Sequence, residues 1–249
     1  MTMNRQLATR QRIRKALIIL SLLLFPVTMN YLSPYVIIDG AAQGIVNGSL
    51  IVFGLQFLSA LFVGRLWCGW VCPAAGLGEV CFGVNNRPVG GRANVIKWFI
   101  WAPWLAIIVM MAVRAGGYQR VDFFHLTERG VSVDEPQKYF IYYIVVGVFL
   151  ALSVFLGRRA GCHTICWMAP FMILGRKLRN LVGWPALRLR AEADRCINCK
   201  KCTQNCTMSL DVNSLVQAGA MEHSECVLCG ACVDVCPKDV IHYTFSAGG

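Results

Sequence analysis

The stretch RLWCGWVCP, residues 65–73, ends a long apolar run of the chain and carries Cys68 and Cys72 in the spacing C-x3-C. A related stretch, GCHTICWMAP at residues 161–170, repeats this spacing after another apolar run. Positions i and i+4 share one face of a helix, so each pair is expected to present two sulfurs in one direction. The sequence therefore predicts a duplicated unit in which each half supplies half of a tetrahedral sulfur site. The four cysteines are Cys68, Cys72, Cys162 and Cys166.

The composition is that of a membrane protein. The chain has 249 residues, of which 56% are hydrophobic and only 15% are charged. Residues 1–190 hold 20 Lys and Arg against 6 Asp and Glu, whereas residues 191–249 hold 4 against 7. The basic residues cluster at the ends of apolar runs, where they act as membrane orientation signals. The positive net charge is therefore not read as a nucleic-acid binding feature.

Four apolar segments approach the roughly 20 residues that a helix needs to cross a bilayer. They are residues 16–38, 45–66, 95–113 and 139–157. The first follows a basic N-terminus, but it is too long for a secretory signal and has no clear cleavage site, so we expect a retained span. Lys and Arg follow the second and fourth segments, which predicts that the N-terminus, both C-x3-C pairs and the tail face the cytoplasm.

The second outer loop, about residues 114–138, contains Asp122, His125 and Glu128. Quinone chemistry couples electrons to protons, and histidine titrates near neutrality, so these side chains are candidates for a quinol site. A solvated loop is the more ordinary explanation of these residues, and the quinol site is kept as the alternative.

The C-terminal tail carries the most specific motif. CINCKKCTQNC and CVLCGACVDVCP each follow C-x2-C-x2-C-x3-C, the bacterial two-cluster ferredoxin pattern, in which the fourth cysteine ligates the other cluster. Zinc ribbons use paired C-x2-C and would leave two cysteines of each run without a role. The expected ligands are Cys196, Cys199, Cys202 and Cys236 for the first [4Fe–4S] cluster, and Cys226, Cys229, Cys232 and Cys206 for the second.

The membrane cysteines admit three readings. Four converging thiolates suit an additional iron–sulfur centre, or else zinc or copper. Two separate dithiol redox pairs and tight helix packing are the alternatives. Arg65, Arg158 and Arg159 are expected to stabilise an anionic thiolate centre, His163 is a candidate ligand or proton carrier, and Cys81 is read as structural. The sequence contains no Ser-His-Asp set, P-loop, Rossmann fingerprint or C-x-x-C-H haem motif.

Taken together, these motifs are similar to those of a known group of proteins. LSALFVGRLWCGWVCP, the second C-x3-C and the double cubane motif together resemble the NapH/NosR/CcoG group of membrane-bound polyferredoxins, NapH most closely, over about residues 16–243. The second copy differs, because Cys166 is followed by three residues before Pro170. The resemblance implies electron transfer between the quinone pool and iron–sulfur or haem partners.

The expected fold is an all-α membrane bundle of four transmembrane helices in residues 1–190, built as a duplicated two-helix unit. An α+β two-[4Fe–4S] ferredoxin-like domain follows in residues 191–249. The expected function is a multi-pass inner-membrane electron-transfer subunit, working with redox protein partners in a larger complex. A quinone cofactor and a quinol dehydrogenase-type oxidoreductase role stay open. The alternatives are a metal-reducing maturation factor of the CcoG type and a membrane anchor that docks a redox partner.

Overall fold

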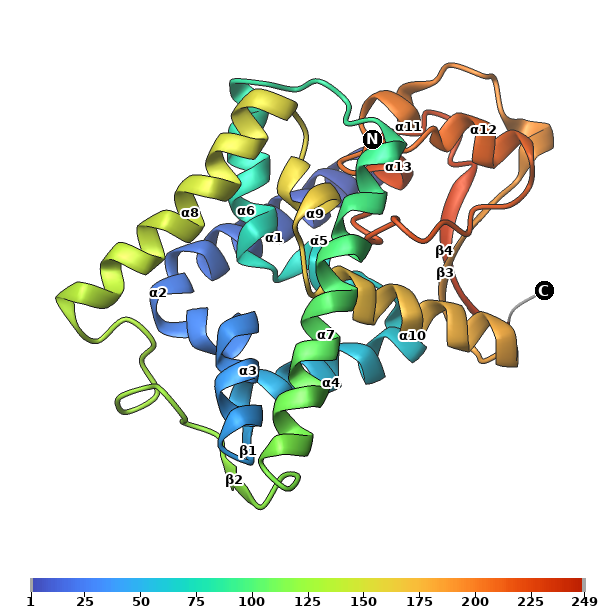
Figure 1. The fold of residues 1–249 in the computed structure, drawn as a ribbon. Coiled ribbons are helices and arrows are strands. Elements are labelled where there is room, and N and C mark those ends of the chain that lie inside the picture. Colours follow the sequence, from blue (N-terminus) through green and yellow to red (C-terminus); the bar gives the residue numbers. More distant parts are fainter. Residues whose placement is uncertain (1, 248–249) are drawn as a thin grey trace.

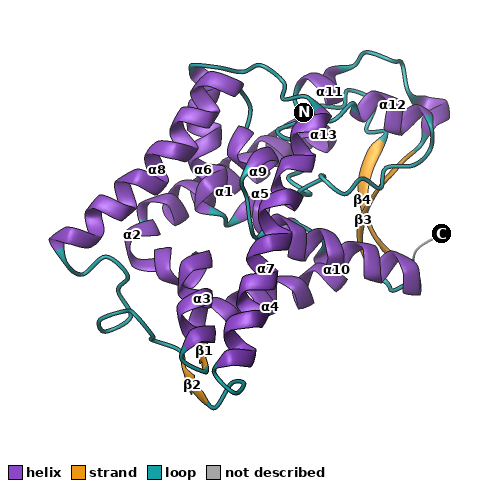
Figure 2. Ribbon diagram, in the orientation of Figure 1, coloured by secondary structure: helices purple, strands orange, loops and turns teal. Residues whose placement is uncertain are grey.

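A computed structural model describes residues 2–247, and the chain is mostly helical (Figure 2). Helix α1 (Thr2–Leu23) is followed by α2 (Phe25–Thr28), the 3-10 helix η1 (Met29–Leu32) and α3 (Pro34–Ala42). The apolar segment expected at 16–38 is therefore interrupted, with a bend of 61° between the helical parts 9–23 and 25–32. Pro26 lies in the first turn of α2, where a proline is tolerated but the preceding helix cannot continue undisturbed.

The second apolar segment begins with a strand. β1 (Ile45–Asn47) pairs in parallel with β2 (Arg120–Asp122), so α4 (Gly48–Val63) is shorter than the expected segment 45–66. Asn47 caps the helix, because its side-chain oxygen accepts a hydrogen bond from the Leu50 amide at 2.9 Å. Short helices α5 (Leu66–Trp70) and α6 (Pro73–Val80) and the 3-10 helix η2 (Cys81–Gly83) follow.

Two long helices have the length and hydropathy of membrane spans. The 3-10 helix η3 (Gly91–Val95) leads into α7 (Ile96–Arg114), and α8 (Pro136–Leu156) comes after the long loop. Phe99, Phe140 and Phe155 are each more than 70% exposed, as expected for side chains that face lipid. Among residues 2–247, two helices are long and apolar enough to cross a bilayer, or three when the bent first segment is taken as one span.

The C-terminal part begins with a strand and returns to pair with it. After α9 (Ala160–Thr164) and α10 (Ala169–Val182), β3 (Ala186–Ala191) pairs antiparallel with β4 (Ile241–Ser246). Between the two strands lie η4 (Ala193–Arg195), α11 (Lys201–Gln204), α12 (Val212–Gln217) and α13 (Ala231–Asp234). The expected domain boundary at residue 190 thus falls within β3.

The C-terminal unit sits beside one end of the helical part. Figure 1 shows α11 and α13 near the N-terminus, while β1 and β2 lie at the opposite end. One buried apolar cluster runs through both parts, because it contains Cys68 and Cys162 together with Leu189, Val227 and Ile241. The two parts therefore pack as one body around this cluster.

Candidate metal centres

The backbone of the two tail cysteine runs is duplicated. Left-handed φ angles at Asn198, Lys200 and Ser209 recur thirty residues later at Leu228, Gly230 and Asp239. Helices α11 and α13 have the same thirty-residue offset. These turns bend each C-x2-C-x2-C run around a central space. The spacing of the cysteines is consistent with such a space but does not specify these turns.

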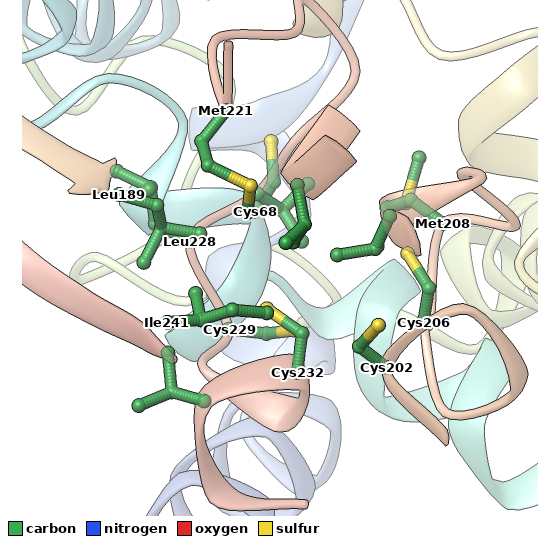
Figure 3. Close-up of a cluster of buried hydrophobic side chains, with 14 of the residues drawn as sticks. Cys68, Leu189, Cys202, Cys206, Met208, Met221, Leu228, Cys229, Cys232 and Ile241 are labelled. Atoms are coloured by element: carbon green, nitrogen blue, oxygen red, sulfur yellow. The ribbon is translucent and has the colours of Figure 1, made fainter. Parts of the chain in front are cut away.

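Two cavities separate the eight tail cysteines into the expected sets. One cavity is lined by Cys206, Cys226, Cys229 and Cys232. The other is lined by Cys196, Cys199, Cys202 and Cys236. The fourth cysteine of each run therefore lies with the first three of the other run. Figure 3 shows Cys206, Cys229 and Cys232 within one buried cluster, with Cys68 in the same cluster.

The donor set at these cavities fits [4Fe–4S] clusters. The amide N–H of Leu210 donates to Cys206 Sγ, and that of Val240 donates to Cys236 Sγ, both at 3.4 Å. Such N–H donors are the groups that stabilise cluster sulfurs. Burial, with the neighbouring Cys229, raises the pKa of Cys206 to about 12, so metal binding there displaces a proton. As placed, no three His, Cys, Asp or Glu side chains in residues 2–247 are arranged to hold a single metal ion.

The membrane cysteine pairs do not lie on continuous helices, so the expected shared helix face is wrong. Helix α5 ends at Trp70, and Cys72 has extended backbone angles just before Pro73. A residue that precedes proline is disfavoured in helical conformation, which explains this break. In the second copy, α9 ends at Thr164, before Cys166.

The four membrane thiols are nevertheless close enough to interact electrostatically. Burial, together with repulsion from Cys68, Cys162 and Cys166, raises the pKa of Cys72 well above its ordinary value. Burial and the same kind of repulsion from Cys162 and Cys68 raise the pKa of Cys166 to about 12. All four side chains are at most 7% exposed. The two halves thus bring their thiols into one buried neighbourhood.

Each half reaches this arrangement through the same local geometry. Gly64 ends α4 with φ 57°, and Gly157 ends α8 with φ 114°, conformations that favour glycine. Arg65 and Arg159 follow, each three residues before the first cysteine of its half, and each is 1% exposed. The duplication predicted from the cysteine spacing is therefore also visible in the chain reversals that deliver the cysteines.

A buried carboxylate, Glu79, lies beside the first pair. It accepts hydrogen bonds from Arg14, at 2.7 Å, and from Arg159. The same guanidinium groups also donate to the motif backbone, Arg14 to the Gly69 carbonyl and Arg159 to the Cys68 carbonyl, each at 3.1 Å. Although burial favours the neutral acid, Arg159 and Arg14 hold the pKa of Glu79 below its usual value.

A second buried carboxylate, Glu225, comes from the tail. It lies 2.7 Å from both Arg65 and Lys97, and the Arg65 guanidinium also donates to the Ser224 carbonyl. Burial opposes its charge, but these two cations lower the pKa of Glu225 to about 2. Glu225 directly precedes Cys226, so this ion group fixes the second tail run against the membrane cysteine loop.

The two cysteine loops touch through their backbones. A Cβ on Gly69 would lie 2.3 Å from the Val227 carbonyl oxygen, so no side chain fits at this position. Next to it, the Trp70 indole donates to the Leu228 carbonyl at 3.1 Å. The residues between Cys68 and Cys72 thus pack directly on the residues between Cys226 and Cys229.

Comparison with known proteins agrees with this geometry. Residues 48–89 and 139–185 match the family described as 4Fe-4S binding domain, and residues 195–241 match the 4Fe-4S dicluster domain. Ferredoxin-type protein NapH of Escherichia coli is 25% identical over 87% of this chain and 76% of its own length. This chain is a relative of the polyferredoxin-type 4Fe–4S proteins. The resemblance inferred from the sequence is thereby confirmed.

Other polyferredoxin relatives are longer. Putative electron transport protein YccM of Escherichia coli is 24% identical over 82% of this chain but 57% of its own length. Nitrogen fixation protein FixG of Rhizobium meliloti is 26% identical over 77% of this chain and 41% of its own length. The chain thus spans about half the length of these two relatives. No solved structure matches it. The matches support an iron–sulfur electron-transfer role.

Sequence reasoning missed the carboxylates of this polyferredoxin relative. Glu79 and Glu225 were not predicted as site residues. Glu79 is the only acidic residue of the sequence between Asp39 and Asp122, and this isolated charge is a signal that could have identified it. Arg158, expected at the thiols, instead donates to the Gln204 carbonyl at 2.7 Å.

His163, between the second pair of cysteines, is held by a neighbouring amide. Its ring Nδ1 lies 2.8 Å from Asn94 Oδ1. Burial is the main reason that its pKa falls to about 4, so the ring is neutral near pH 7.

The outer loop places its candidate proton carriers around His125. The ring Nε2 lies 2.7 Å from Asp39 Oδ2, and Nδ1 lies 3.9 Å from Asp122 Oδ2. Glu128 takes part in a backbone bridge with Val131. The structure thus brings His125 and Asp122 together and adds Asp39, which the sequence did not single out.

Proposed function

We propose that this protein is a membrane-bound electron-transfer subunit that connects a redox protein on the cytoplasmic side with the quinone pool. The eight tail cysteines hold two [4Fe–4S] clusters, and the four membrane cysteines hold a further metal centre. When bound, these groups supply one-electron chemistry. The observation that carries the proposal is that thiols from both halves of the duplication share one buried neighbourhood against the tail.

The packing supports four passes through the bilayer, with residues 1–190 as the membrane domain and 191–249 as the ferredoxin domain. Arg10 of α1 pairs with Asp234 of the tail, so the chain begins at the end that carries the cysteines. It reaches β1 at the opposite end and returns along α4, and α7 and α8 repeat this path (Figure 1). Basic residues cluster at the cysteine end, which supports a cytoplasmic position for that end.

Two adjoining apolar cavities lie along this path, and the larger has room for a quinone. One of about 600 Å³ lies between the first segment and α8, and its lining includes Ser132 and Lys138. A smaller cavity shares Phe25 and Trp167 with it and reaches Pro73, next to Cys72. Ligand sites are mostly apolar with a few polar groups that fix orientation. This pair of cavities is a better candidate for the quinone site than Asp122, His125 and Glu128 of the outer loop, because the cavities lead toward the thiols.

Quinol-driven reduction tests the proposal. The full-length protein, purified without oxygen and placed in lipid nanodiscs, should lose visible iron–sulfur absorbance when a reduced quinone is added. Val145→Trp, which fills the wall shared by the two cavities, should slow this reduction at least tenfold without changing iron content. Gly147→Ala, at an open position of the same helix, is the control. If Val145→Trp and Gly147→Ala are reduced at equal rates, the cavity is not the quinone site. If quinol does not reduce the wild-type protein, the proposed connection to the quinone pool is wrong.

A second candidate, metal reduction or maturation, is favoured by one contact. Cys68 Sγ lies 3.5 Å from Met172 Sδ, and thiolate with thioether is a donor set that selects Cu(I). Met172→Leu conserves volume and removes only the thioether. Under the leading proposal this variant keeps its metal content. Stoichiometric reduction of added Cu(II) by the wild type, lost in Met172→Leu, would favour the maturation role instead.

A further inference from the structure

The membrane cysteines are surrounded by more buried positive than negative charge. Four cations lie within this region with at most 2% of their side chains exposed. They are Arg14, Arg65, Lys97 and Arg159. Among the described residues, two carboxylates, Glu79 and Glu225, pair with them, so four positive charges against two negative charges leave an excess of two. Backbone carbonyls of Cys68 and Gly69 satisfy hydrogen bonds of these cations but carry no net charge.

Such an excess of buried positive charge destabilises the folded protein unless an anion shares the site. A buried charge that lacks a counter-charge is strongly destabilising, whereas a paired one is tolerated. Four neutral thiols leave the excess in place. Four thiolates around a metal core of charge +2 carry a net charge of about −2, as expected for an oxidised [4Fe–4S] centre. The positive excess therefore equals the charge that such a centre brings.

Two of the four cations, Arg65 and Arg159, come from equivalent positions of the duplication. Arg65 interacts electrostatically with Cys68 and Cys166, one cysteine from each half. Arg159 interacts with Cys162, and its guanidinium donates to the Cys68 carbonyl of the other half. Each arginine shares its carboxylate with a second cation. Arg159 and Arg14 share Glu79 of the membrane part, and Arg65 and Lys97 share Glu225 of the tail.

We propose that Arg65 and Arg159 are matched counter-charges that set the reduction potential of the four-cysteine centre. Glu79 and Glu225 act through them as positioning and tuning residues. Because Glu225 belongs to the tail, docking of the ferredoxin domain tunes the membrane centre. This inference rests on the proposed function, since it requires a metal centre at the four thiols.

The direction of each effect follows from charge. Reduction adds a negative charge, so removing a nearby carboxylate favours the reduced state and raises the potential. Glu225→Gln and Glu79→Gln should each raise the potential of the four-cysteine centre, and Arg65→Met should lower it. Arg65→Lys keeps the positive charge and should recover most of the wild-type value.

A redox titration of the full-length protein, followed by electron paramagnetic resonance, measures these potentials. We expect about a tenfold change in the ratio of reduced to oxidised centre at a fixed potential, or about 59 mV for one electron. Glu222→Gln is the control, because this carboxylate pairs with Arg176, Arg179 and Arg188 and not with any of the four cations. Metal content measured on the same samples separates a failure of the proposed function, which requires metal at the four thiols, from a failure of the proposed tuning by Arg65 and Arg159.

Three outcomes are decisive. Shifts of the stated sign, absent in Glu222→Gln and recovered in Arg65→Lys, support the inference. Unchanged potentials in variants that keep their full metal content overturn it and leave the proposed function intact. A wild-type protein without metal at the four thiols overturns the proposed function itself. If Glu225→Gln does not fold, Glu79→Gln and the two Arg65 variants give the same decision.

Discussion

The tail and the membrane part both place cysteines from two duplicated halves around common spaces, but they do so by different means. In the tail, the fourth cysteine of each run crosses to the other half, and backbone N–H groups reach the sulfurs of Cys206 and Cys236. In the membrane part, all four thiols share a single neighbourhood, and charged side chains surround them.

The difference follows from where each site lies. The tail is a small, partly solvated unit in which Cys199 is exposed, so water and amides moderate charge there. The membrane thiols are fully enclosed, where only a buried cation compensates an anion effectively. The comparison teaches that the charge balance of a site, and not only its cysteine count, identifies what it is built to hold.

The largest expected effect tests the crossing of the fourth cysteine. Cys206→Ser should remove the cluster that Cys226, Cys229 and Cys232 hold, with loss of about 4 iron atoms per chain. Iron analysis of protein purified without oxygen measures this. Cys81→Ser is the matched control, because Cys81 is buried but lies outside both cavities. A full iron content in Cys206→Ser would show that the tail sites are partitioned differently.

A smaller effect tests the dependence of the membrane site on buried ion groups. Glu79→Gln leaves Arg14 and Arg159 without their carboxylate, and breaking a buried pair costs about 3–5 kcal/mol. The thermal unfolding midpoint in detergent should fall by roughly 6–20 °C. Glu192→Gln breaks an exposed pair with Arg195 and should change it by only about 0–4 °C. Similar shifts in the two variants would contradict the role given to the buried group.

The smallest effect concerns the junction between the two regions. Gly69→Ala places a Cβ 2.3 Å from the Val227 carbonyl oxygen, so the cysteine loops must separate. Overpacking of this kind costs about 1–3 kcal/mol, which lowers the unfolding midpoint by roughly 2–12 °C. Gly54→Ala, where the added Cβ meets no atom within 4 Å, should leave the midpoint nearly unchanged. Proteolysis of the tail, faster in Gly69→Ala alone, would locate the damage at the junction.

Much of the site was readable from cysteine spacing, because ligand spacing is a local property. The tail runs specify two sets of four thiols, and the repeat of C-x3-C indicates the duplication. What spacing did not reveal is the break at Trp70, which places Cys72 at the start of α6 and not on the helix of Cys68. Pro73 carried that signal, since the residue before a proline avoids helical conformation.

Contacts between residues far apart in the chain could not be predicted from the sequence. Glu225 pairs with Arg65 across 160 residues of chain, and no local pattern specifies such a contact. The apolar runs were recognised correctly, but their division into helices was not. Segment 16–38 bends near Pro26 and Pro34, as prolines in a helix predict, whereas strand β1 at the start of segment 45–66 was not expected. Hydropathy reports burial in lipid and does not report where a helix bends.

Metal analysis tests the central claim most directly. Iron, zinc and copper are measured per chain in the wild type and in a variant with serine at Cys68, Cys72, Cys162 and Cys166. The account predicts about 8 iron atoms in both proteins, together with further metal in the wild type that the variant lacks. About 8 iron atoms in each protein, with no additional metal in the wild type, would contradict it.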